Sequence, residues 1–98
     1  MYLSKGGFVY IITNKHHTVL YTGVTSNLQR RIKQHINHAY KGSFTDRYNC
    51  NKLVYYCGFP HIGAAIAEEK RIKAGSRKQK IKLIAGMNPE WRDLWEEI

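Results

Sequence analysis

Two short runs of β-branched and aromatic residues open the regular pattern of the chain. Phe8 to Thr13 and Thr18 to Gly23 are separated only by the polar segment Asn14 to His17. Runs of this composition, joined by a short polar stretch, are typical of two antiparallel strands in a hairpin. The pattern therefore predicts a hairpin within the first quarter of the chain.

The register of this hairpin decides which side chains meet. If Lys15 and His16 are the two turn residues, Tyr10 lies directly opposite Tyr21. Directly opposed side chains in an antiparallel pair are about 5 Å apart at Cβ, so both phenols would lie together on one face. A cross-strand tyrosine pair that only packs a core is the more common case, and it remains an alternative.

Helical periodicity begins after the hairpin and predicts an amphipathic helix over 28–39. The repeating apolar positions are Leu28, Ile32, Ile36 and Ala39. Ser26 or Asn27 can cap the start. At about 100° per residue, His35 falls inside the apolar face and Arg31 at its edge, whereas Arg30 points away.

Arg31 and His35 each allow two interpretations. A guanidinium beside two phenols can bind a phosphate by two parallel hydrogen bonds and stabilise charge that develops on it. An isolated arginine at this position more often lays its stem on the apolar rim, with its head in water. A lone histidine on an apolar face is equally compatible with a structural role.

A second amphipathic helix is predicted over 62–73, with an acidic residue inside its apolar face. The apolar positions are Ile62, Ala65, Ile66 and Ile72, and Glu69 lies in their middle. A carboxylate there is costly unless it is paired, protonated or bound to a cation. Glu69 is therefore a candidate site residue, and an ion pair with Arg31 or Lys73 is the alternative.

The remaining segments complete the predicted architecture. Lys52 to Gly58 is predicted to be a strand and Lys41 to Asn51 a loop. Asn88-Pro89 is typical of a cap before a short helix. Trp91, Leu94, Trp95 and Ile98 indicate that this C-terminal helix docks on the body, or alternatively forms a weak homodimer contact. The order of elements predicts an α+β domain with a small three-stranded, mainly antiparallel sheet covered by helices.

Length and composition narrow the class of protein. Ninety-eight residues, 43% of them hydrophobic, are expected to form a single domain over 1–98. The sequence has no long apolar run and no secretory leader, so we expect no membrane partner and a cytoplasmic location. Cys50 and Cys57 form no CxxC motif and are interpreted as reduced thiols. The five histidines have no recognised zinc spacing.

Charge indicates a nucleic-acid partner. Sixteen Lys and Arg residues against seven Asp and Glu residues give a net charge of +9 and an isoelectric point near 9.8. Seven of the cations fall within residues 70–82: Lys70, Arg71, Lys73, Arg77, Lys78, Lys80 and Lys82. Such a run is often only a solvated helix face, but interleaved apolar residues would let one side pack while the other follows phosphates. Charge does not separate DNA from RNA.

Several separated segments together resemble the GIY-YIG nuclease family. The family includes intron homing endonucleases and the C subunit of the bacterial excision-repair nuclease, and the chain is most similar to its smallest members. The segments that carry the resemblance are Val9 to Asn14, Leu20 to Thr25, Leu28 to Ile32 and Asn88 to Leu94. Two departures from the name-giving motifs occur: Phe8-Val9-Tyr10 lacks the first glycine, and Thr22 replaces isoleucine.

The resemblance implies a metal-dependent endonuclease that hydrolyses phosphodiester bonds in DNA, in repair or processing. Tyr10 would be the general base and Tyr21 would orient water or phosphate. Gly23 would let the backbone approach closely, and Arg31 would hold the scissile phosphate. His35 would share the proton transfer or hydrogen-bond to Tyr10. A free phenol has a pKa of about 10, so Tyr10 would need a nearby cation or hydrogen-bond donor.

The resemblance also implies a metal ligand. In the family an alanine stands four residues before a single glutamate that holds the metal, and Ala65 and Glu69 match this pattern. Glu69 would hold Mg²⁺ or Mn²⁺ through its carboxylate, together with waters and phosphate. Asn88 matches a late asparagine near the family's site. Tentative nucleic-acid contacts are Lys73, Arg77, Lys78, Lys80 and Lys82. Two alternatives remain: a non-catalytic nucleic-acid-binding module with the same fold, and a protein-interaction domain that uses the C-terminal aromatic residues.

Overall fold

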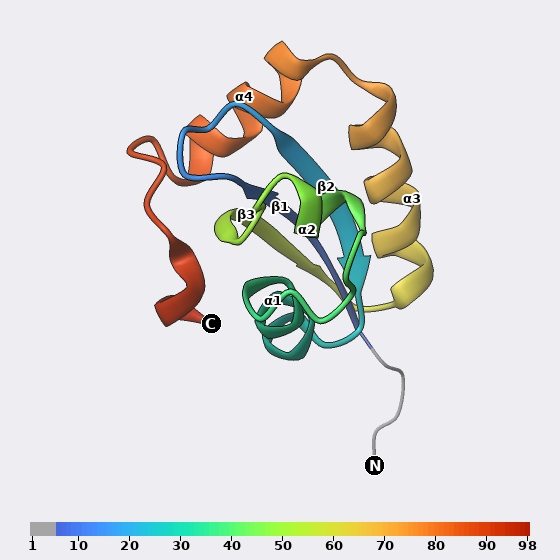
Figure 1. Ribbon diagram of the computed structural model, residues 1–98. Coiled ribbons are helices and arrows are strands. Elements are labelled where there is room, and N and C mark those ends of the chain that lie inside the picture. Colours follow the sequence, from blue (N-terminus) through green and yellow to red (C-terminus); the bar gives the residue numbers. More distant parts are fainter. Residues whose placement is uncertain (1–5) are drawn as a thin grey trace.

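A computed structural model describes residues 6–98 and confirms the predicted α+β class (Figure 1). The elements in chain order are β1 (Gly7–Thr13), β2 (Leu20–Thr25), α1 (Leu28–Ile36), α2 (Phe44–Arg47), β3 (Lys52–Phe59), α3 (Ile62–Ala74), α4 (Arg77–Met87) and the 3₁₀ helix η1 (Leu94–Glu97). The prediction of a single domain over 1–98 includes residues 1–5, which lie outside the described residues.

The three strands form an antiparallel sheet in the order β2-β1-β3. The predicted hairpin register is wrong by two residues, because Tyr10 pairs with Gly23 and Tyr21 pairs with Ile12. A shift of two residues keeps every side chain on its original face, so both phenols still share one face.

Asn14 explains the longer loop of the hairpin. Its side-chain oxygen accepts hydrogen bonds from the backbone N–H groups of Thr18 at 2.8 Å and Val19 at 3.1 Å. Residues 14–19 therefore form the loop, and the pairing of β1 with β2 begins at Thr13 and Leu20. His17 adopts the left-handed conformation, with φ of 59°, to close this loop.

Helices cover the sheet on both sides (Figure 1). On one side α1 and η1 pack over a core made by Tyr10, Ile12, Leu28, Ile32, Cys50, Leu53 and Leu94. On the other side α3 and α4 pack over Val9, Ile11, Val54, Ala65, Ile72 and Ile84. The central strand β1 contributes to both cores, so its side chains are almost all buried.

The helix α1 is shorter than the periodicity predicted. Its side-chain cap is Asn27, which accepts from the N–H of Arg30 at 3.0 Å. It ends at Ile36, and His38 then takes a φ of 52°, which is incompatible with a continuing helix. Ala39 is exposed and belongs to the connection that follows.

Two other predicted segments are corrected. Residues 41–51 are not a plain loop, because Ser43 caps the short helix α2 by accepting from the N–H of Asp46. Asn88 does not begin the last helix; it ends α4, and the C-terminal segment forms one 3₁₀ turn capped by Asp93. Docking of this segment on the body is confirmed by Leu94, which is only 2% exposed. A homodimer contact through the same segment stays a prediction.

The buried face of α3 is turned relative to the expected one. Ala65, Glu69 and Ile72 are buried, whereas Ile62 and Ile66 are exposed at 36% and 38%. The reason is that α3 packs on β1 and on the edge strand β2, so its contact stripe is narrow. Within residues 6–98, no helix has the length and apolar character needed to cross a membrane.

Candidate active site

Gly23 lets the Tyr10 side chain cross the sheet toward the edge strand. In the observed register Gly23 is the cross-strand partner of Tyr10, and the tyrosine ring lies over it. A Cβ on residue 23 would lie 2.9 Å from Cε2 of Tyr10 and closer still to the phenol oxygen. Any other residue would therefore displace the ring, which explains the glycine in the second motif.

Two side chains contact the Tyr10 hydroxyl, and a third holds one of them in place. Nε2 of His35 lies 2.9 Å from the hydroxyl, and Nε of Arg31 donates to it at 3.3 Å. The other ring nitrogen of His35 lies 3.0 Å from Oγ1 of Thr45, a buried residue of α2. The proposed hydrogen bond between His35 and Tyr10 is therefore present in the structure.

Burial sets the protonation states at this centre. Burial raises the pKa of Tyr10 to about 12, although the hydrogen bond and the charge of Arg31 both act to lower it. Burial, and then the charge of Arg31, lower the pKa of His35 to about 4. At neutral pH the phenol therefore keeps its proton and the imidazole is neutral, with one N–H to donate.

Tyr21 and Arg31 stand at the open side of this cluster. The Tyr21 ring is 6.5 Å from that of Tyr10 and 5.8 Å from that of His35, measured between centroids. The Arg31 guanidinium lies 5.2 Å from the centroid of Tyr40 and donates through Nη1 to Gln34 at 3.2 Å. Its Nη2 makes no hydrogen bond within residues 6–98, so it is free to bind an oxygen anion.

Glu69 belongs to the same centre, although it comes from α3. Its carboxylate contributes to the raised pKa of Tyr10, after burial and the phenol of Tyr21. Glu69 is 7% exposed and pairs with Nζ of Lys73 at 2.6 Å. The same ammonium lies 5.8 Å from the ring centroid of Tyr21. Of the two ion-pair partners considered from the sequence, the structure selects Lys73.

The donor set at Glu69 fits one particular mode of metal binding. Among the described residues, no group of three or more His, Cys, Asp and Glu side chains is placed to hold a metal ion. Mg²⁺ commonly binds through one or two carboxylates together with waters and substrate phosphates, and Glu69 supplies one such carboxylate. Glu69 is thus suited to bind a divalent cation jointly with substrate, provided that the Lys73 ammonium shares or leaves it.

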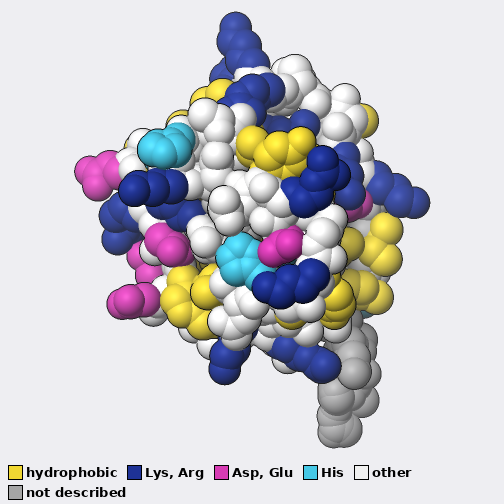
Figure 2. Space-filling view, in the orientation of Figure 1, with side chains coloured by type: hydrophobic (Ala, Val, Ile, Leu, Met, Phe, Trp, Pro, Cys, Tyr) yellow, Lys and Arg dark blue, Asp and Glu magenta, His cyan; other side chains and the backbone are white. Residues whose placement is uncertain are grey.

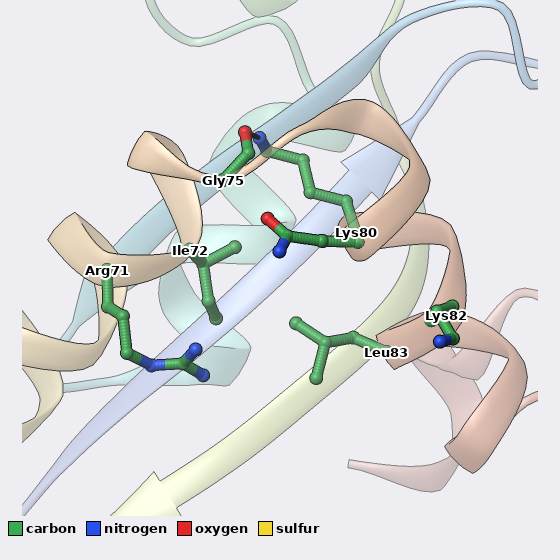
Figure 3. Close-up of a pocket in the computed structure, with 7 residues that line it drawn as sticks. Arg71, Ile72, Gly75, Lys80, Lys82 and Leu83 are labelled. Carbon is green, nitrogen blue, oxygen red and sulfur yellow. Dashed lines mark hydrogen bonds between the residues drawn. The ribbon is translucent and has the colours of Figure 1, made fainter.

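The basic run does not form one continuous line of phosphate contacts. A groove of about 270 Å³ lies between α3 and α4 and is lined by Arg71, Lys80 and Lys82 (Figure 3). Lys80 donates to the carbonyl of Gly75 at 2.8 Å, and Arg71 pairs with Glu68. The groove is therefore partly closed by the protein's own contacts.

The other cations of this run point in different directions. Arg77 donates to the carbonyl of His17 at 2.8 Å. At about 100° per residue, Lys78 projects from the side of α4 nearly opposite to Lys80, whereas Lys82 borders the groove. Only Lys73 of this set reaches the tyrosine centre.

The acidic residues are unevenly distributed over the face seen in Figure 2. Figure 2 shows Lys and Arg side chains across the whole visible face, including the edge formed by α3 and α4. Asp and Glu gather mainly near the C-terminal segment in the same view. Four of the seven acidic residues lie in the last nine positions, which accounts for this asymmetry.

Asn88 lies apart from the site in this structure. It is 3% exposed, and its amide donates to the carbonyls of Val54 at 3.2 Å and Arg92 at 2.7 Å. Its oxygen accepts from the N–H of Arg92 at 3.0 Å. The side chain thus ties the C-terminal segment to β3 and leaves no group for a nucleic-acid contact.

The fold and the site together define a class of protein. Two tyrosines of the antiparallel sheet meet the inward arginine of α1 and the buried glutamate of α3. Residues 6–82 match the model of the GIY-YIG catalytic domain, and the chain belongs to the GIY-YIG family. The first motif, Phe8-Val9-Tyr10, keeps its tyrosine without its glycine.

Relatives of the chain are small proteins of similar length. It is 36% identical over 91 residues to UPF0213 protein CPE1444 of Clostridium perfringens, covering 93% of this chain and 96% of that protein. It is also 36% identical over 86 residues to a UPF0213 protein of Autographa californica nuclear polyhedrosis virus, covering 86% and 81%. The solution NMR structure of UPF0213 protein BH0048 from Bacillus halodurans matches with a TM-score of 0.57, 28% identity and coverage of 90% and 92%.

The neutral state of His35 predicts a pH-dependent stability. The pKa of this imidazole is about 4 in the fold and 6.5 ordinarily, so the unfolded chain binds more protons between these values. The free energy of unfolding should fall by about 2 kcal/mol as the pH drops from 6.5 toward 4. Urea denaturation at pH 7 and pH 5 measures this change. His35→Gln should remove most of it, and the exposed His16→Gln should not; equal pH dependence in the two variants would contradict the assignment.

Proposed function

We propose that this protein is a metal-dependent endonuclease that hydrolyses phosphodiester bonds in DNA. One observation carries the proposal: a buried phenol is hydrogen-bonded to both an imidazole and a guanidinium, and the carboxylate of Glu69 approaches the same centre through Lys73, which lies over the ring of Tyr21. A core that needed only packing would not bury the polar groups of Tyr10, His35 and Glu69 at this position, because each costs free energy to desolvate. The arrangement supplies what phosphodiester hydrolysis requires.

Proton transfer is assigned to the Tyr10–His35 pair. With His35 donating from Nδ1 to Thr45, its Nε2 accepts the proton of the Tyr10 hydroxyl. The phenol oxygen then takes a proton from the attacking water as it passes its own proton to His35, so the pair acts as a relay. A phenol with a pKa of about 12 can serve in this way without first losing its proton.

Substrate binding favours this relay. Arg31 is the second cause, after burial, of the low pKa of His35. A phosphate anion paired with Nη2 of Arg31 offsets that charge, and the imidazole then accepts a proton more readily. Arg31 also stabilises the negative charge that develops on the phosphoryl oxygens. Tyr21 faces the same space and orients the water or the phosphate.

A divalent cation on Glu69 would add Lewis-acid stabilisation of the phosphate and of the departing oxygen. Lys73 pairs with this carboxylate at 2.6 Å. This contact also favours a second candidate function, a non-catalytic nucleic-acid-binding module, because the ammonium already occupies the only carboxylate that the site offers among the described residues.

Cleavage and binding assays separate the two functions. End-labelled single-stranded, duplex and branched DNA would be incubated with the protein in Mg²⁺, in Mn²⁺ or in EDTA, and binding would be measured in EDTA. The nuclease proposal predicts internal cuts that require the metal. Salt-dependent binding with no cleavage of any substrate in either metal would favour the binding module and overturn the proposal.

Removing the Lys73 ammonium should strengthen cation binding at Glu69. Lys73→Met deletes a positive charge that competes with the metal, and loss of one partly exposed pair corresponds to about a three- to tenfold tighter Mn²⁺ affinity. Electron paramagnetic resonance of free Mn²⁺ measures the affinity directly. Lys70→Met is the matched control, since Lys70 is exposed and makes no ion pair among the described residues. Identical Mn²⁺ affinities in the two variants would show that Glu69 does not hold the ion.

A further inference from the structure

Exposed aromatic side chains gather in the connection between α1 and β3. Tyr40 is 54% exposed, Phe44 47% and Tyr48 43%. The other large hydrophobic residues that are comparably exposed in the described chain are aliphatic and lie on α3, on α4 and at its end. Aromatic residues bury large apolar areas when they pack, so three exposed rings within nine residues require an explanation.

These rings continue outward from the candidate active site. The Phe44 ring is 5.9 Å from that of Tyr21, and the Tyr48 ring is 4.8 Å from that of Phe44, measured between centroids. The row therefore starts at a residue of the site and ends at the surface of α2. Tyr40 borders the same space from the other side, beneath the Arg31 guanidinium at 5.2 Å.

The segment that carries the rings is firmly held. Thr45 is buried against His35, and the backbone carbonyl of Thr45 accepts from the N–H of Cys50 at 2.9 Å. The Asp46 carboxylate accepts from the N–H of Gly42 at 2.7 Å and lies 2.8 Å from Nδ1 of His38. The exposure of the rings is thus part of the folded geometry, and the surface is preorganised.

Positive charge alternates with the rings. The Arg47 guanidinium lies 5.7 Å from the centroid of Tyr48, and Arg31 lies over Tyr40. Lys41 is exposed between them, while the one carboxylate of the segment, Asp46, is engaged internally. Cations interleaved with exposed aromatic rings suit a polyanion with flat, apolar faces, which describes a nucleic-acid strand.

The occupant must present a free base face. In a duplex both faces of each base are covered by stacked neighbours, so a ring on the protein surface cannot stack on them. An unpaired base can stack on an aromatic side chain with a gain of about 1–3 kcal/mol. Since the row of Phe44 and Tyr48 begins beside Tyr21, a base stacked on these rings would belong to a nucleotide next to the phosphate bound at the candidate active site.

We propose that Phe44 and Tyr48 form a stacking platform for an unpaired nucleobase of the DNA strand whose phosphate pairs with Nη2 of Arg31. The inference rests on the proposed nuclease function and narrows its substrate class to DNA that is single-stranded at the cut. Specificity comes from the need for an exposed base face, with no hydrogen bonds to base edges.

Binding in EDTA tests the platform independently of cleavage. Anisotropy of a labelled single strand and of the matching duplex would be measured with wild type, Phe44→Ala and Tyr48→Ala. Each variant should bind the single strand about 5- to 100-fold more weakly and the duplex within about twofold of wild type. Ile81→Ala, at an exposed aliphatic position on α4, is the control and should change neither affinity.

Phe44→Trp provides a complementary measurement. It keeps a stacking surface, so it should bind the single strand at least as well as wild type, and its added fluorescence should be quenched by the single strand. Thermal unfolding checks that all variants are folded. We expect them to be, because the substituted side chains are exposed. Equal losses for single strand and duplex, or no loss in either alanine variant, would overturn the platform.

The outcomes separate this inference from the proposed function. If wild type binds single strands through these rings but cuts no DNA, the nuclease assignment fails and the platform stands. If wild type cuts DNA and both alanine variants bind and cut single strands as it does, the platform fails and the nuclease stands.

Discussion

Arg31→Met should lower the rate of DNA cleavage by about 10²- to 10³-fold at saturating protein, the usual cost of losing a charged donor to the developing anion. The side chain donates to Tyr10 and keeps Nη2 free for the substrate phosphate. Methionine retains much of the stem and its packing, so the fold should persist. Single-turnover cleavage of a labelled strand measures the rate.

Arg30→Met is the matched control for this experiment. It removes the same charge from the neighbouring position, which is exposed and faces away from the site. General attraction to DNA should weaken equally in both variants, whereas the single-turnover rate should fall only for Arg31→Met. If the two substitutions slow cleavage by the same factor, Arg31 acts only as part of the basic surface.

Gly23→Ala should reduce both stability and activity. The added Cβ would overlap the Tyr10 ring, so the ring or the edge strand must move. Overpacking of this kind costs about 1–3 kcal/mol, which lowers the melting temperature of a domain of this size by about 5–20 °C. Displacing the phenol also breaks its hydrogen bonds to His35 and Arg31, so cleavage should fall with it.

Gly63→Ala separates the steric effect from the general effect of replacing glycine. Residue 63 lies in α3, and a Cβ there meets no atom within 4 Å. Alanine should raise the stability of this helix by about 0.5–1 kcal/mol. Melting by circular dichroism would compare the two variants. A Gly23→Ala protein that melts and cuts as wild type does would contradict the placement of Tyr10 over residue 23.

Local periodicity predicted most of the fold. Strands were found where β-branched and aromatic residues cluster, and helices where apolar residues recur at helical spacing. The register of the hairpin was wrong because Asn14 bonds to two backbone N–H groups in the turn, a contact that composition does not reveal. The short helix α2 was missed because four residues are too few to show a periodic pattern.

The site was only partly visible in the sequence. Spacing predicted the inward placement of Tyr10, Arg31 and His35, and the resemblance to the GIY-YIG family assigned them to a site; the structure brings their side chains together. Thr45 was missed, since a single threonine in a polar stretch carries no signal until the fold places it against His35. The hydrogen-bonding role of Asn88 depends on contacts with β3 and residue 92, which no local pattern contains.

Electrostatic expectations at the site also needed the structure. A cation near Tyr10 was expected to lower the pKa of the phenol, and Arg31 does act in that direction. Burial outweighs it and raises the pKa to about 12. The balance depends on how completely β2 and α1 enclose the ring, which is a property of tertiary packing.

Comparing Glu69→Gln with Glu68→Gln tests the central claim most directly. Both substitutions remove one negative charge from α3, but Glu69 is buried at the tyrosine centre and Glu68 pairs with Arg71 on the surface. Single-turnover cleavage of DNA in Mn²⁺ would be measured for both, with DNA binding in EDTA as the check on folding and affinity. The nuclease account predicts a loss of about 10²-fold or more in rate for Glu69→Gln, with intact binding, and little change for Glu68→Gln. Cleavage by Glu69→Gln at the rate of wild type would contradict it.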